Sequence, residues 1–149
     1  MAQNSGTKRL FNTHFNNEGV HFMLLIIRLA IGAFMLVHGY QKFAVLLGDT
    51  DIQFGDPIGL GVDLSFYLTV FAEFFCSIAL IFGFATRLAV IPLIITMLVA
   101  VFIVHAPDGF DKKELGLHYL VVYLLLLVVG PGKYSIDRLI SPSSSKRRR

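Results

Sequence analysis

The sequence predicts an all-α membrane protein, namely an antiparallel four-transmembrane-helix bundle with a short interfacial helix after the last span. Two observations predict this class, the composition and the length of the apolar runs. Of the 149 residues, 55% are hydrophobic and 15% are charged, and the mean hydropathy is +0.69. A soluble domain of this size cannot bury so much apolar surface. The apolar windows also lack the polar face of a soluble amphipathic helix, so a bilayer is the expected solvent.

Four runs approach the ~20 residues that a helix needs to cross a hydrocarbon core. They cover about 22–43, 64–83, 88–105 and 115–130. Helices are expected because lipid cannot satisfy backbone polar groups and because no alternating barrel pattern is present. Glycine and proline separate the runs, and Gly130-Pro131-Gly132 ends the fourth.

The chain divides into three parts on this interpretation. Residues 1–21 form a cytoplasmic N-terminal segment, 22–130 the four-helix membrane domain, and 131–149 an interfacial helix with a basic cytoplasmic tail. Ile136, Leu139 and Ile140 share one helical face, which favours the membrane surface. The terminal cluster Lys146–Arg149 is better explained by anionic lipid headgroups than by nucleic acid.

Lysine and arginine are distributed unevenly among the loops. Most of them occur in the N-terminal segment, at Arg87 in the second loop and in the C-terminal segment, whereas the first loop has four aspartates and no basic residue and the third has Lys112 and Lys113 among acidic residues. Cytoplasmic loops carry the excess of basic residues. Both termini are therefore expected on the cytoplasmic side of a bacterial inner membrane.

Two ionisable residues lie at membrane depth, where such groups are functional candidates. Helical spacing gives each of the first two spans one polar stripe: Arg28, Met35, His38, Gly39 and Lys42 on the first, and Ser65, Thr69, Glu73, Cys76 and Ser77 on the second. We expect the stripes to face each other and Arg28 to meet Glu73, directly or through water. The alternative is a structural ion pair that fixes helix packing. Glu73 fits either role, whereas Arg28 favours the structural one because it can partly snorkel.

A second polar group is predicted near the outer interface. His38, Gln41 and Lys42 end the first span, His105 ends the third, and His118 and Tyr119 begin the fourth. Such a set could hydrogen-bond a quinone carbonyl, ligate a metal or hold a haem between two histidines. The alternative is an interfacial aromatic belt, which is favoured for His118 and Tyr119.

Other cofactor chemistry has little support in the sequence. No HxxH or HxxxH spacing occurs, so a structural metal site is not expected, and no haem, flavin or metal site is identified. Cys76 is the single cysteine, which excludes an intrachain disulfide and a dithiol pair.

Several segments resemble the DoxX family of small four-helix membrane proteins. The first span matches at Arg28, Gly32 and His38-Gly39-Tyr40-Gln41-Lys42, and the second matches at Glu73. The resemblance continues with Gly83-Phe-Ala-Thr86-Arg87-Leu-Ala89, His105-Ala-Pro107-Asp-Gly109-Phe110 and Gly130-Pro131-Gly132-Lys-Tyr134-Ser135-Ile-Asp137. Members often have an acidic residue before an aromatic one at the start of the fourth helix; here His118 precedes Tyr119.

The resemblance implies an association with quinol oxidation or with membrane oxidoreductase assemblies that respond to thiol or oxidative stress. On this hypothesis Glu73, His38 and His105 act as catalytic proton acceptors. The ligand-binding candidates are Arg28, Gln41, Lys42, His118 and Tyr119. A partner redox protein, membrane-bound or peripheral, would carry the electrons. The sequence leaves open whether the chain also forms a homo-oligomer. The alternatives are a non-catalytic accessory subunit and a small-solute binder along the polar seam.

Overall fold

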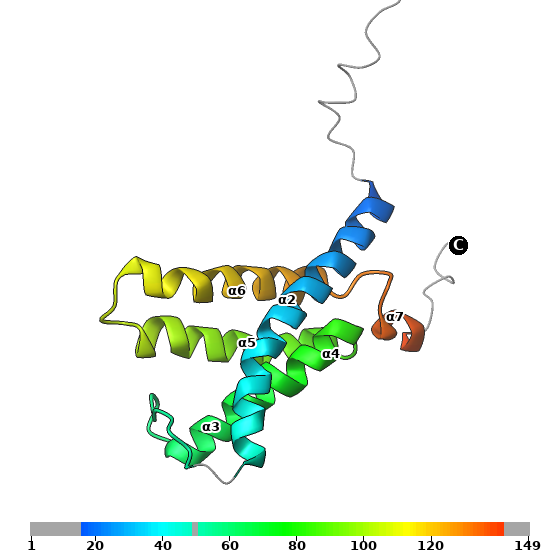
Figure 1. Ribbon diagram of the computed structural model, residues 1–149. Helices are drawn as coiled ribbons and strands as arrows, with labels where there is room; N and C mark the ends of the chain where they lie inside the picture. Colours follow the sequence, from blue (N-terminus) through cyan, green and yellow to red (C-terminus); the bar gives the residue numbers. More distant parts are fainter. Residues whose placement is uncertain (1–15, 49–50, 142–149) are drawn as a thin grey trace, which may run out of the picture.

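The computed structural model describes residues 16–48 and 51–141, and within these ranges every regular element is a helix. The first long helix is α2 (Asn17–Leu47). The second segment runs through α3 (Val62–Val70), the π-helical stretch η1 (Phe71–Cys76) and α4 (Ser77–Phe82). The third comprises α5 (Thr86–Val99) and the π-helical η2 (Ala100–Val104), followed by α6 (Phe110–Val129) and α7 (Ile136–Ile140) (Figure 1). The predicted basic tail and most of the predicted N-terminal segment lie outside the described residues.

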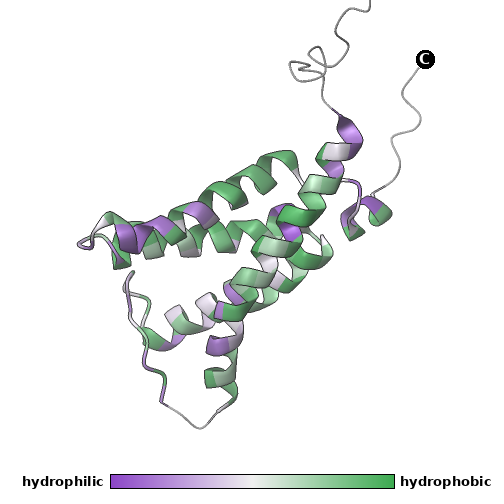
Figure 2. Ribbon diagram, turned by 45° about the horizontal axis from the view of Figure 1, so that its top comes forward, coloured by the Kyte–Doolittle hydropathy of each residue, from purple (hydrophilic) through white to green (hydrophobic). Residues whose placement is uncertain are grey.

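Three helical segments are long and apolar enough to cross a membrane: Asn17–Leu47, Val62–Phe82 and Thr86–Val104. The all-helical membrane class is therefore confirmed with three candidate spans. The fourth long helix, α6, has 20 residues but starts with four charged ones in its first turn and a half. Figure 2 shows the contrast, with hydrophobic residues over most of the long helices and hydrophilic ones at the start of α6.

Close contact between α2 and the second segment fixes their relative position. Arg28 lies beside Gly83 and Gly39 lies on the backbone of Glu73, so the two segments run in opposite directions. A Cβ atom at Gly39 would come within 2.4 Å of the Glu73 carbonyl, so only glycine allows this approach. The predicted stripes meet where Gly39 lies on the Glu73 backbone and Lys42 pairs with Glu73. Most of their residues are buried, whereas His38 is exposed and Thr69 is half-buried.

The helices α5 and α6 lie side by side in Figure 1, and α2 crosses them. Leu80, Leu93, Tyr123 and Leu126 are fully buried at the centre. Large apolar side chains are exposed on every long helix, as expected for a surface that lipid covers.

The C-terminal segment packs against the turn between the second and third segments. Ala85 has the left-handed value φ 46° in this turn. The Asp137 carboxylate accepts hydrogen bonds from the N–H groups of Ala85 (2.6 Å) and Thr86 (2.9 Å), and the Asp137 N–H donates to the Gly83 carbonyl (2.9 Å). A short helix thus begins where the sequence predicts one, and the side chain of its Leu139 is 84% exposed.

Candidate functional site

A buried ion pair joins α2 to the second segment. The Lys42 Nζ donates to Glu73 Oε2 at 2.7 Å, with the Glu73 side chain 7% exposed and that of Lys42 27% exposed. Glu73 lies in the π-helical stretch Phe71–Cys76, a type of irregularity that recurs at functional sites. A carboxylate in an apolar bundle is costly unless it is paired, so Lys42 compensates the charge of Glu73.

The predicted pair between Arg28 and Glu73 is wrong. The two Arg28 Nη atoms donate to the carbonyl oxygens of Pro131 and Tyr134, each at 2.7 Å. The reason is helix register, because Arg28 lies opposite Gly83 and is separated from the level of Glu73 by several turns. Arg28 is buried and anchors the segment after α6, which agrees with the structural role favoured for it.

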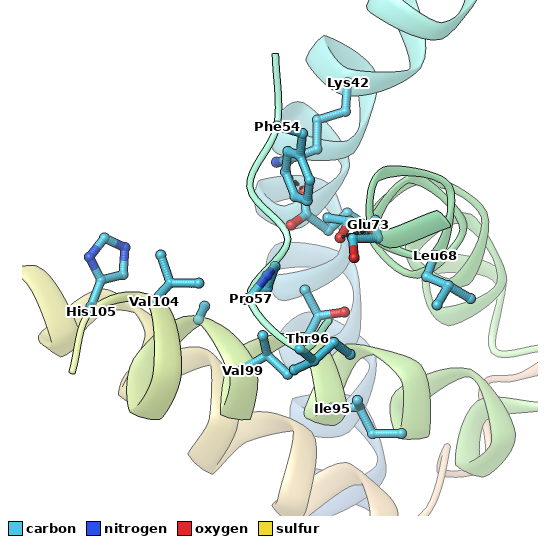
Figure 3. Close-up of a pocket in the computed structure, with 14 residues that line it drawn as sticks. Lys42, Phe54, Pro57, Leu68, Glu73, Ile95, Thr96, Val99, Val104 and His105 are labelled. Atoms are coloured by element: carbon cyan, nitrogen blue, oxygen red, sulfur yellow. Dashed lines mark hydrogen bonds and ion pairs between the residues drawn. The ribbon is translucent and has the colours of Figure 1, made fainter. Parts of the chain in front are cut away.

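An apolar cavity of about 320 Å³ adjoins the Lys42–Glu73 pair. Figure 3 shows Lys42 reaching towards Glu73, with His105 across the cavity beyond Val104. The remaining polar groups in its wall are the hydroxyls of Ser65, Thr69 and Thr96. The apolar lining comes from Phe54, Pro57, Ile58, Leu68, Ile95, Val99, Ala100 and Val104. A mostly apolar cavity of roughly 300–1,000 Å³ with a few convergent polar groups is typical of small-ligand sites.

The loop before α3 closes part of this cavity with Phe54, Pro57 and Ile58. The Asp56 carboxylate holds the loop by accepting from the N–H groups of Gly61 and Leu60, each at 2.9 Å, and from the Ser65 hydroxyl at 3.2 Å. The Gly61 N–H, helped by the other donors, holds the pKa of the Asp56 carboxyl below its ordinary value. The ring of Phe54 packs edge-on against Phe66, with centroids 5.5 Å apart.

A second, smaller cavity of about 170 Å³ lies between α2, the π-helical stretches and α6. It shares Lys42, Glu73, Ala100 and His105 with the first cavity and adds the polar side chains of His38, Lys112 and Tyr119. The His38 and Tyr119 rings meet edge to face with centroids 6.4 Å apart. The ion pair therefore borders both a mainly apolar cavity and a more polar one.

The structure brings five of the eight predicted site residues together: His38, Lys42, Glu73, His105 and Tyr119. Gln41 lies beside Lys42 but lines a separate open cavity near Phe54. Exposed His118 makes its hydrogen bond within α6, between its Nδ1 and the Glu114 carbonyl at 2.8 Å, and lines neither cavity. Arg28 also lines neither.

Sequence reasoning missed two polar residues that line the cavities and one partner of a lining residue. Lys112 lies in the first turn of α6 and Thr96 lies midway along α5. The Asp108 carboxylate pairs with His105 Nδ1 at 2.7 Å. His105 and Asp108 are three residues apart in one loop, and this spacing could have indicated the pair. Whether Thr96 and Lys112 line a cavity depends on how α5 and α6 are rotated about their axes in the bundle, which sequence spacing alone does not show.

Chemically, the arrangement offers a proton acceptor and a cation within one partly apolar cavity. Glu73 can accept a proton, and Lys42 can donate hydrogen bonds to a carbonyl or stabilise an anionic oxygen. His105 and Tyr119 provide further hydrogen-bonding groups at the cavity walls. Among the described residues, no group of three or more His, Cys, Asp or Glu side chains is placed to hold a metal ion.

Comparison with known proteins places the chain in a family. The family model of DoxX matches residues 23–106. An uncharacterized protein of Haemophilus influenzae is 32% identical, covering 78% of this chain and 82% of that protein. An uncharacterized membrane protein of Mycobacterium tuberculosis is 28% identical, covering 79% of this chain and 81% of that protein. No solved structure gives a significant match. With the family model covering more than half of its length, this chain belongs to the DoxX family.

Proposed function

We propose that this chain is a quinone-linked component of a membrane oxidoreductase, which binds a quinone or quinol headgroup in the 320 Å³ cavity and acts with a partner redox protein. The observation that carries the proposal is the Lys42–Glu73 ion pair in the wall of that cavity. Both the volume and the apolar lining fit a flat ring with two polar ends, and the pair supplies a hydrogen-bond donor and a proton acceptor at one point of the wall.

The proposed topology has four spans in a bacterial inner membrane with both termini in the cytoplasm. Twenty residues give α6 a length of about 30 Å, enough for a hydrocarbon core. The charged residues of α6 are confined to its start, where they would lie at the outer interface. The exposed Leu139 and Ile140 of α7 would lie in the cytoplasmic interface. In this topology the ion pair and its cavities would lie in the outer half of the membrane.

The chain's residues would manage protons and position the ligand. A quinol loses two protons and two electrons when it becomes a quinone. Glu73 would accept one proton, and His105 or His38 would accept the other. Lys42 would donate a hydrogen bond to the ligand oxygen and stabilise its anionic form. The two electrons would leave to the partner redox protein, which would also have to approach the ligand cavity.

The test is direct binding of a short-chain ubiquinone to the detergent-purified protein, measured by equilibrium dialysis. Loss of a hydrogen bond to a charged group costs about 1.5–3 kcal/mol, which corresponds to roughly a 10–100-fold loss of affinity. We expect that loss for Lys42→Met and a comparable one for Glu73→Gln. The matched control is Glu114→Gln, because Glu114 is exposed and its side chain makes no hydrogen bond with the described residues.

Equal ubiquinone affinity in all variants, or no binding by the wild type, would contradict the proposal. The alternatives are a non-catalytic accessory subunit and a small-solute binder. Co-purification of the same membrane partners with wild type and Glu73→Gln, together with the absence of extractable quinone, would favour the accessory subunit.

A further inference from the structure

A basic cavity of about 380 Å³ lies at the turn between the second and third helical segments, away from the candidate site. Its walls come from three parts of the chain that meet there: the turn and start of α5, the segment after α6, and α7. The lining residues are Ala85, Thr86, Arg87, Leu88, Pro131, Gly132, Asp137, Arg138 and Ser141. None of them lines the two cavities of the Lys42–Glu73 pair.

Two guanidinium groups from different elements line this cavity. Arg87 Nη2 donates to the Val128 carbonyl at 3.1 Å, which holds the Arg87 side chain against the end of α6. Within residues 16–48 and 51–141, neither Arg87 nor Arg138 forms an ion pair. The carboxylate in the wall, Asp137, already accepts backbone N–H groups on both of its oxygens. The cavity therefore has two available cations and one acid whose oxygens are engaged.

A buried threonine hydroxyl lies behind the cavity wall. The Thr86 side chain is fully buried, and its Oγ1 has no hydrogen-bond partner among the described residues. A buried hydroxyl without a partner is uncommon, because leaving it unpaired costs about 1–3 kcal/mol. The donors that the cavity presents are the two guanidinium groups, and these match the donors from which phosphate oxygens accept hydrogen bonds.

The surroundings of the cavity are apolar and exposed. Leu88, 70% exposed, lines the cavity itself, and the adjoining Val128 and Leu139 are 76% and 84% exposed. In a membrane protein such side chains contact acyl chains. These apolar side chains would not contribute to the binding of a soluble phosphate ion. A phospholipid, in contrast, presents a phosphate and acyl chains together.

We propose that Arg87 and Arg138 form a binding site for the phosphate of an anionic phospholipid, with its acyl chains along Leu88 and Val128. The site fastens the α7 segment and the turn before α5 to the headgroup layer. It does not depend on quinone binding or on which leaflet this end of the protein faces.

The test is native mass spectrometry of the full-length protein after delipidation and exposure to mixed micelles with equal amounts of phosphatidylglycerol and phosphatidylcholine. A basic residue near an anionic surface contributes about a fivefold change in affinity. We expect the wild type to retain phosphatidylglycerol selectively, Arg138→Gln to lose about fivefold of that preference, and the double variant Arg87→Gln/Arg138→Gln to lose about 25-fold. Arg138 is the cleaner position, because its guanidinium makes no hydrogen bond to a described residue.

Two control variants separate this site from general attraction of cations to anionic lipid. Lys113→Gln removes one charge at the far end of α6, and replacement of Lys146 and Arg147–Arg149 by glutamine removes the basic tail. Both should keep the preference for phosphatidylglycerol. Loss of the preference with the tail variant, or its retention in the Arg87/Arg138 double variant with unchanged helix content by circular dichroism, would overturn the proposal. Displacement of the bound lipid by millimolar inorganic phosphate would also overturn it in favour of a soluble anion.

Discussion

Lys42→Met, Glu73→Gln and the corresponding double variant form a thermodynamic cycle that measures how strongly the two side chains interact. The 2.7 Å contact between Lys42 Nζ and Glu73 Oε2 joins α2 to the π-helical stretch of the second segment. A parallel cycle with Arg28→Met and Glu73→Gln tests the partner that the sequence pattern favours. The two cycles share one variant, so they compare two possible partners of the same carboxylate.

The structure gives the expected size of each coupling. At 2.7 Å and an effective dielectric constant of about 20, the gross attraction is roughly 6 kcal/mol. Desolvation of both groups removes most of it, and the 27% exposure of Lys42 reduces it further, so we expect a net coupling of about 2 kcal/mol. Arg28 precedes Lys42 by 14 residues, or about 21 Å along the helix, so its coupling to Glu73 should stay below about 0.5 kcal/mol.

The assay is reversible unfolding in mixed micelles of a mild detergent and dodecyl sulfate, followed by far-ultraviolet circular dichroism. Lys42→Met alone should destabilise the protein by about 3 kcal/mol, because it leaves a buried carboxylate without its cation. A coupling for Lys42–Glu73 below 0.5 kcal/mol, or a larger one for Arg28–Glu73, would refute the register described above.

Three further predictions concern the parts of the fold that hold the candidate site in place. Arg28→Met removes two charge-assisted hydrogen bonds to the Pro131 and Tyr134 carbonyls, so it should destabilise the protein by about 3 kcal/mol and speed amide exchange in residues 131–141; slow exchange there would argue against the anchor. Gly39→Ala places a Cβ atom 2.4 Å from the Glu73 backbone and should lower the unfolding free energy by about 1–3 kcal/mol, whereas Gly55→Ala, with no atom within 4 Å of the added carbon, should have little effect. Because the folded pKa of Asp56 lies below the unfolded value of 3.8, its contribution to loop stability is complete above that value and is lost as the pH falls through the folded pKa. The protection factors of amides in residues 51–61, which correct for the intrinsic exchange rate at each pH, should therefore fall below about pH 4 in the wild type and show no such step in Asp56→Asn.

The helices could be predicted from sequence because hydropathy is a local property. Each predicted apolar run lies almost wholly within one observed helical segment, and the turn chemistry of Gly130-Pro131-Gly132 ends α6 as expected. The polar stripes could also be predicted, since side-chain direction along a helix follows from 3.6 residues per turn. Ser65, Glu73 and Ser77 are accordingly all buried on one face.

The two π-helical stretches were not predicted from the sequence, although both border the candidate site. Phe71–Cys76 carries Glu73, and Ala100–Val104 leads into His105. Such a stretch widens the helix locally and changes the rotation of the side chains that follow it, so the direction of His105 could not be calculated from a regular helix. The packing of Asp137 on the turn at Ala85 was likewise hidden, because it joins residues about fifty positions apart.

By itself the sequence determined the helical class, the polar faces and the residues worth testing, because lipid forces the backbone into helices and confines charge to the interior. Only the tertiary structure decided which charges meet. Gly39 lies against the Glu73 backbone and Gly32 lies against the Ile81 side chain, and these close contacts set the axial offset of the two opposed segments. Because of that offset, Glu73 pairs with Lys42, and Arg28 donates hydrogen bonds to the carbonyls of the C-terminal segment. An axial offset depends on how the surfaces of two helices fit together. The hydropathy pattern of each helix does not determine it, because apolar faces can pack against each other at many offsets.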